Sequence, residues 1–181
     1  MAKDRKIDMV ILGLLAHEDM TGYDIKKRID NEISFFWKGS FGSIYPALGK
    51  MMEAGYVEVT GPEFRGRREK IRYHITGQGL KVLQTWLRDS KADNDLKYET
   101  LVKLFFGGSA GRETSIRNIE QFEKEIGVAL AILKQYQKTL EKVLQEEDHI
   151  YYYLTVEFGI DTYETYLRWC EKAKKRLSES G

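Results

Sequence analysis

Apolar positions near the start of the chain follow the period of an α-helix. Between residues 5 and 17 they recur every three or four residues, at Ile7, Val10, Ile11, Leu14 and Leu15. This spacing places them on one face and predicts a helix over 5–17. Thr21 and Asp24 have the spacing of a capping box, so a second helix is expected to begin there. Its buried stripe is formed by Ile25, Ile29 and Ile33.

A third helix and a change of period follow. Residues 43–54 have a helical apolar stripe, Pro46 fits only in the first turn of that helix, and Gly55 ends it. Residues 56–60 and 70–75 then alternate as strands do. The Gly- and Pro-containing stretch 61–69 predicts a loop between them, which gives a two-stranded hairpin. A fourth helix should begin at Thr76, with one face formed by Leu80, Leu83, Trp86 and Leu87.

The second half of the chain predicts longer helices. After a polar linker at 91–95, residues 96–106 form a short helix that two glycines stop. One amphipathic segment then runs from 112 to about 148, and a second from 150 to 177, with a kink or break expected at Gly159. A helix over 112–148 would extend about 55 Å, too far for a small domain to cover alone. We therefore expect a mostly α protein, with a winged helix-turn-helix DNA-binding domain at 1–90 and a helical dimerisation domain at 91–181.

Composition restricts where any nucleic-acid surface can lie. The 181 residues are 42% hydrophobic and 31% charged, which is typical of a soluble folded chain, and the net charge is only +1. A DNA-binding surface must therefore be a local basic patch. Residues 61–76 provide one, with two acidic residues against five basic ones: Arg65, Arg67, Arg68, Lys70 and Arg72.

The order of these elements is typical of a winged helix-turn-helix. Its third helix is slim enough to enter the major groove of DNA, which is about 12 Å wide. The second helix braces the third across the phosphates, and the wing arginines can reach the flanking backbone or the minor groove. The alternative is a winged-helix protein-interaction module without DNA binding, and the basic wing argues against it.

Several runs of residues resemble the PadR family of transcriptional regulators. They are ILGLL at 11–15, TGYDI at 21–25, GSIYPAL at 42–48, AGYV at 54–57 and RYHITGQG at 72–79. The resemblance covers about residues 5–90. The chain departs from the family at Met51-Met52, where leucine is commoner, and at Gly49 in the third helix. The second half resembles the virulence-activator-like helical C-terminal domain of the larger PadR subfamily, through 104–108 and 167–170.

The resemblance implies a homodimeric repressor that binds a palindromic operator and responds to a small aromatic or drug-like effector. It implies phosphate contacts for Tyr23 and Lys26, and positions facing the groove for Ser40, Ser43, Tyr45 and Lys50. It assigns Arg67, Arg68 and Lys70 to the wing. The charge pattern adds Lys27 and Arg65. Tyr45 could instead pack between helices, and each lysine could be an ordinary solvated charge. His74 is expected to be a surface side chain.

The sequence contains no pattern of catalytic or metal-binding residues. The histidines and Cys170 are scattered without ligand spacing, and no glycine-rich phosphate loop is present. We therefore expect no cofactor, no metal and no enzymatic activity. The single cysteine, together with the lack of a signal-peptide pattern or a membrane-spanning run, predicts a cytoplasmic protein.

Aromatic residues are densest between 151 and 169. This group consists of Tyr151, Tyr152, Tyr153, Phe158, Tyr163, Tyr166 and Trp169. Tyrosine combines apolar bulk with a hydroxyl group, which suits interfaces and ligand pockets alike. We favour interface or core packing. The alternative is an effector cavity, for which the candidates are Trp86, Tyr153, Tyr163 and Trp169.

Overall fold

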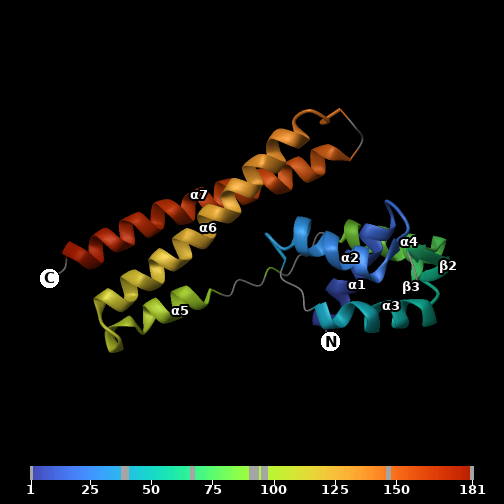
Figure 1. Ribbon diagram of the computed structural model, residues 1–181, viewed down its shortest axis with the longest axis horizontal. Coiled ribbons are helices and arrows are strands. Elements are labelled where there is room, and N and C mark those ends of the chain that lie inside the picture. The colour runs from blue at the N-terminus through green and yellow to red at the C-terminus, as the bar shows by residue number, and fades with distance from the viewer. Residues whose placement is uncertain are drawn as a thin grey trace. The chain divides into compact units, whose positions relative to one another are not determined.

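The computed structural model describes residues 2–37, 41–65, 68–89, 94, 98–145 and 148–179. The chain forms two compact units, Met1–Asn94 and Asp95–Gly181 (Figure 1). Ser40, Arg67 and most of the predicted linker at 91–95 lie outside the described residues.

The first unit is a small helical domain with a three-stranded antiparallel sheet, as expected for a winged helix. Its sheet has the order β1-β3-β2. In chain order the elements are α1 (Ala2–Leu15), β1 (Met20–Thr21), α2 (Gly22–Arg28), a π-helical turn (Ile29–Ile33), a 3-10 turn (Phe41–Ser43), α3 (Ile44–Glu53), β2 (Val57–Arg65), β3 (Arg68–Ile75) and α4 (Gly77–Arg88).

One core holds the helices of this unit together. Ile11 and Leu12 of α1, Ile25 of α2 and Leu48 of α3 are almost completely enclosed, and Val57 of β2 is buried with them. Removing each of these side chains from water contributes about 1.5–3 kcal/mol. The core thus fixes α2 and α3 against α1, with the sheet at one end.

Local signals place three helix ends where the sequence predicts them, whereas the first helix, predicted over 5–17, spans Ala2–Leu15. Thr21 Oγ1 accepts a hydrogen bond from the Asp24 backbone N–H at 3.2 Å, and Asp24 Oδ2 accepts one from the Thr21 backbone N–H at 3.3 Å. The predicted capping box is therefore confirmed. Gly55 ends α3 with a φ of 71°, a left-handed conformation that favours glycine. The Thr76 hydroxyl caps α4 and donates to the Gly55 carbonyl at 2.7 Å.

The predicted loop at 61–69 is wrong. The two strands continue to its tip, where Arg65 pairs with Arg68. Gly61, at a φ of 137°, follows an irregularity in the register that lets the ladder resume with one extra residue in β2. Pro62 is tolerated because β2 is an edge strand, where a missing N–H costs little. The sheet also has a third strand, β1, that the sequence analysis missed.

Gly79 allows α4 to pack against the chain that precedes β2. A Cβ atom added there would lie 2.2 Å from the Tyr56 carbonyl oxygen and 3.0 Å from Ile75 Cγ1. We expect Gly79→Ala to lower the free energy of unfolding by about 1–3 kcal/mol, because a backbone atom cannot rotate away. Gly77→Ala is the matched control, since a Cβ there meets nothing within 4 Å. Urea titration that gives the two variants equal stability would contradict this close packing.

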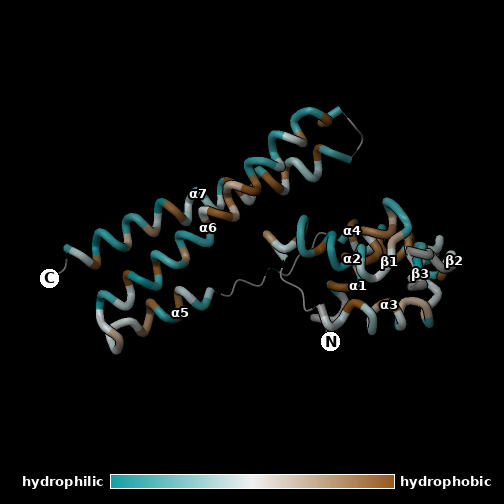
Figure 2. Tube along the Cα trace, in the orientation of Figure 1, coloured by the Kyte–Doolittle hydropathy of each residue, from teal (hydrophilic) through white to brown (hydrophobic). Residues whose placement is uncertain are grey.

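The second unit is built from helices. It contains α5 (Glu99–Phe105), a 3-10 turn (Gly107–Ser109), α6 (Arg112–Leu140) and α7 (His149–Glu179). Helices α6 and α7 lie side by side as a long antiparallel pair, and apolar residues recur along both (Figures 1 and 2). The predicted continuation of one helix from 112 to 148 is wrong, because α6 ends at Leu140.

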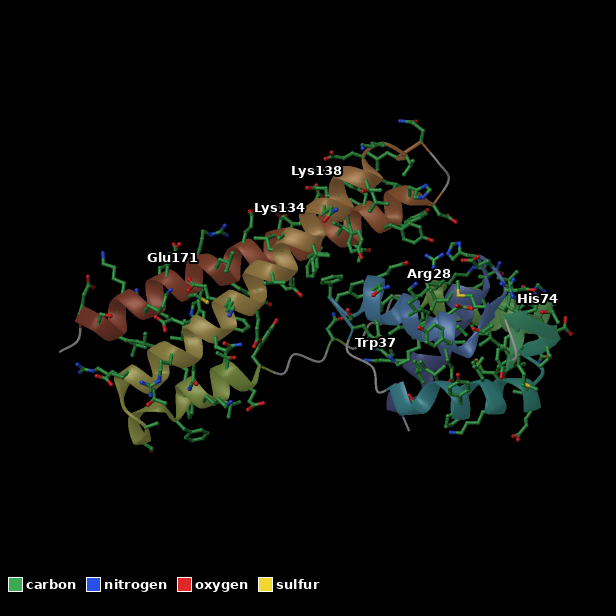
Figure 3. The ribbon with its side chains drawn as sticks, in the orientation of Figure 1. Arg28, Trp37, His74, Lys134, Lys138 and Glu171 are labelled. Carbon is green, nitrogen blue, oxygen red and sulfur yellow. The ribbon has the colours of Figure 1, made fainter. Side chains whose placement is uncertain are left out.

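The predicted kink at Gly159 is also wrong, because α7 runs through it without a break. A Cβ atom at Gly159 would lie 2.8 Å from Leu133 Cδ1 of α6. The glycine therefore allows a close approach of the two helices rather than a bend. Around this contact Ile126, Leu130 and Ile160 are buried, and Lys134 of α6 pairs with Glu164 of α7 at 2.7 Å (Figure 3).

Candidate nucleic-acid interface

Helix α3 has one buried face and one exposed face. Ile44, Ala47, Leu48 and Met51 are buried against α1 and α2. The opposite face is exposed and consists of Tyr45, Pro46, Gly49, Lys50 and Glu53. A helix packed inside the domain could not reach a nucleic acid, whereas this one presents an uncovered side along its whole length.

Helix α2 packs against α3 and presents further residues that the sequence analysis selected. Tyr23 is 57% exposed, and both Lys26 and Lys27 are exposed. Lys26 Nζ lies 2.8 Å from Asp30 Oδ2, one turn further along the chain. An exposed pair of this kind contributes little stability. Lys27 forms no ion pair with any residue that the structure describes.

Tyr45 lies at the first turn of α3 and remains 63% exposed, although its ring rests on Gly22 of α2. Both interpretations made from the sequence therefore have a counterpart in the structure: one edge of the ring packs between helices and the rest faces outward. Ser43 is half-buried and precedes α3, and Lys50 is exposed near its end.

The hairpin strands carry three of the basic residues assigned to the wing. Arg65, Arg68 and Lys70 lie in β2 and β3 around the tip of the hairpin. Strand pairing places these three basic positions at one end of the hairpin.

The first unit contains ion pairs that were not predicted from the sequence. The Arg28 guanidinium lies 2.8 Å from Glu18 and 2.9 Å from Glu32 (Figure 3). Its hydrogen bond with Glu32, and to a smaller extent the one with Glu18, raises the pKa of Arg28. His74 Nδ1 of β3 lies 2.7 Å from Asp19 Oδ1, so this histidine is half-exposed but paired. The Arg28–Glu32 pair was readable from its spacing of four residues, whereas the His74–Asp19 pair joins distant parts of the chain.

Four aromatic residues of the second unit, Tyr98, Phe122, Tyr163 and Tyr166, pack against one another. The hydroxyls of Tyr98 and Tyr166 share a hydrogen bond, and both rings contact Phe122 of α6. Burial, followed by the hydrogen bond with Tyr166, raises the pKa of Tyr98. Burial also raises the pKa of Tyr163, whose ring centroid lies 6.1 Å from that of Tyr166. This cluster fits the packing interpretation.

Three of the effector candidates are spread along α7, and the fourth belongs to the first unit. Tyr153 and Tyr163 are ten residues apart on α7, which corresponds to about 15 Å along the helix axis. Tyr153 accepts a hydrogen bond from Gln137 at 3.3 Å. Trp169 is half-buried further along α7, and Trp86 is exposed on α4 of the first unit. An open pocket of about 260 Å³ lies in the first unit between α1 and α3, and none of the four candidates lines it.

Two further findings concern metals and membranes. Within the described ranges, no group of three His, Cys, Asp or Glu side chains could hold a metal ion. None of the helices described there is long and apolar enough to cross a membrane.

Two family models match the chain, one in each unit. Residues 11–85 match the transcriptional regulator PadR-like family, and residues 96–178 match the C-terminal domain called virulence activator alpha. Among curated proteins, the negative transcriptional regulator PadR of Bacillus subtilis is 25% identical over 175 residues, which span 92% of this chain and 94% of that protein.

Solved structures of that relative have the same fold. The crystal structure of Bacillus subtilis PadR in complex with operator DNA matches with a TM-score of 0.82 and 25% identity, over 96% of this chain and 98% of that one. The structure of the same protein in complex with p-coumaric acid matches with a TM-score of 0.72 and 23% identity, over 99% of each chain.

Proposed function

Because the chain belongs to the PadR family of transcriptional regulators, we propose that it binds operator DNA as a homodimer and represses transcription. The observation that carries this proposal is the exposed outer face of α3, which the buried inner face holds in a fixed direction. In this account α3 enters the major groove and α2 contacts the flanking phosphates. The basic tip of the wing lies against the backbone beside them.

The residues assigned to DNA fall into three groups. Tyr23, Lys26 and Lys27 of α2 contact phosphates. Ser40, Ser43, Tyr45 and Lys50 face the groove. Arg65, Arg67, Arg68 and Lys70 form the basic wing. Phosphate contacts position the protein, and specificity arises from the few side chains that reach base edges, so Tyr45 and Lys50 are the main candidates for base contacts.

Exposed apolar side chains support the homodimer. The sequence predicts that Leu80, Trp86 and Leu87 share one face of α4 with Leu83, but only Leu83 is buried, and Leu87 is 65% exposed. In the second unit Phe105 is 83% exposed and Phe158 67% exposed. Apolar surface on this scale marks a protein contact, and a second copy would cover it.

A small aromatic ligand is the effector class that we propose. A structure of the Bacillus subtilis relative with p-coumaric acid supports a small aromatic ligand. We infer that such a ligand would act by binding one spacing of the two α3 helices more tightly than the other, because a ligand shifts an equilibrium only by its differential affinity. We assign no catalytic step to the protein and propose that it acts in the cytoplasm.

Selection from a random pool of duplexes tests the proposed function. The full-length protein should enrich a palindromic sequence whose half-sites are about 10 base pairs apart, or a multiple of that spacing. Tyr45→Ala serves as the comparison and should enrich the same site more weakly. A pool that shows no enriched sequence after repeated rounds would overturn the proposal and favour the protein-interaction alternative.

A further inference from the structure

Two motifs that are separate in the sequence meet at one contact. Gly22 is the first residue of α2, and Tyr45 lies in the first turn of α3. A Cβ atom added at Gly22 would lie 2.6 Å from Tyr45 Cε1, 3.0 Å from its Cζ and 3.2 Å from its hydroxyl oxygen. The outer edge of the tyrosine ring therefore rests directly on the α-carbon of a residue that has no side chain.

We propose that Gly22 is a positioning residue for DNA recognition, because the space it leaves fixes the direction in which the exposed Tyr45 ring faces the groove. This inference rests on the proposed function, in which Tyr45 contacts DNA. It assigns to Gly22 a role through Tyr45 rather than a contact of its own, since Gly22 itself is buried.

The surroundings of the ring support a fixed orientation. Tyr45 is 63% exposed, so few protein atoms surround its side chain. The contact with Gly22 is therefore a main restraint on the direction of the ring. Burial first, and the charge of the Tyr45 hydroxyl second, raise the pKa of Tyr73 in β3, so Tyr45 lies within electrostatic range of that strand. The printed contact of the ring is therefore with α2, at Gly22.

The backbone at Gly22 does not itself require glycine. No left-handed φ occurs there, and the residue follows the Thr21 cap at the start of a regular helix, where alanine is the better helix former. The atoms that a new Cβ would strike belong to the far end of a flexible, exposed side chain. Gly22→Ala should therefore displace the Tyr45 ring and leave the fold intact.

Displacement of the ring matters because hydrogen bonds are short. A tyrosine hydroxyl must lie about 2.7–3.0 Å from its partner, and a change of side-chain rotamer moves it well beyond that range. Holding the side chain in its bound direction before DNA arrives also reduces the entropy lost on binding. Both effects act on affinity and neither acts on stability.

A double-mutant cycle tests the role of Gly22. Dissociation constants for the selected operator would be measured for the wild type, Gly22→Ala, Tyr45→Ala and the double variant. We expect Gly22→Ala to weaken binding about tenfold in the wild-type background and to have no effect in the Tyr45→Ala background. Gly77→Ala is the matched control: Gly77 also follows a threonine cap, and a Cβ there meets nothing within 4 Å.

Three results would overturn the role of Gly22, and a fourth would instead defeat the proposed function. Unchanged operator affinity in Gly22→Ala would overturn the inference, as would an equal loss in both backgrounds, which would show that Gly22 acts without Tyr45. A thermal midpoint clearly below that of Gly77→Ala would assign Gly22 to folding and would also overturn it. A wild-type protein that binds no duplex would instead defeat the proposed function, so the two failures can be told apart.

Discussion

A chain that ends near Ser90 should lose its dimer and most of its operator affinity. The first unit has its own core, so we expect this fragment to keep its helical circular dichroism spectrum and to sediment as a monomer. Two linked DNA-binding domains bind more tightly than one, because the second domain binds as an intramolecular event. This raises the affinity by about 100- to 10,000-fold. The fragment should therefore bind a single half-site as the full chain does, and a complete operator about 100-fold more weakly or worse.

Sedimentation of the fragment and duplex titration measure the two parts of this expectation separately. A full-length protein at the same concentration is the control for assembly. A fragment that sediments as a stable dimer would contradict the assignment of dimerisation to residues 91–181. That result would point instead to the exposed face of α4, where Trp86 and Leu87 are uncovered.

Removal of the wing charges should weaken binding to every duplex. We expect Arg67→Ala/Arg68→Ala to lower affinity for operator and random DNA alike, because these guanidinium groups contact phosphates in the proposed complex. Each lost phosphate contact reduces the slope of log K against log salt by about 0.9, so the slope should fall by about 2 for each protomer. The matching drop in affinity at low salt should be at least about tenfold.

Titration of one duplex at several salt concentrations gives both quantities. Lys124→Ala/Lys138→Ala is the matched control, because it removes the same charge from two exposed positions on α6. Its slope should equal that of the wild type. If the wing variant keeps the wild-type slope, the wing does not contact phosphates and has no part in the mechanism.

Features set by neighbouring residues were predictable from the sequence. The Thr21–Asp24 capping box depends on residues three positions apart, and the end of α3 at Gly55 depends on one backbone conformation. The inner and outer faces of α3 follow from its helical period alone. The part of the candidate site that lies on α2 and α3 was therefore accessible without a structure.

Features set by distant residues were not predictable. The stretch at 61–69 has the composition of a loop, yet pairing along β3 keeps it in a strand. Gly159 looks like a helix breaker, but the neighbouring Leu133 of α6 determines its role as a site of close approach. The same holds for Gly22, since no local pattern indicates that the Tyr45 ring lies on it. In each case the physical cause is a partner that folding brings close.

The central claim is that the outer face of α3 lies in the major groove of DNA. Methylation interference at guanine N7, an atom that is exposed in the major groove, tests it most directly. With the selected operator and the full-length protein, we expect methylated guanines to block binding in two patches on one side of the duplex, about one helical turn or a multiple of it apart. Binding that tolerates methylation of every guanine in the site would contradict the account.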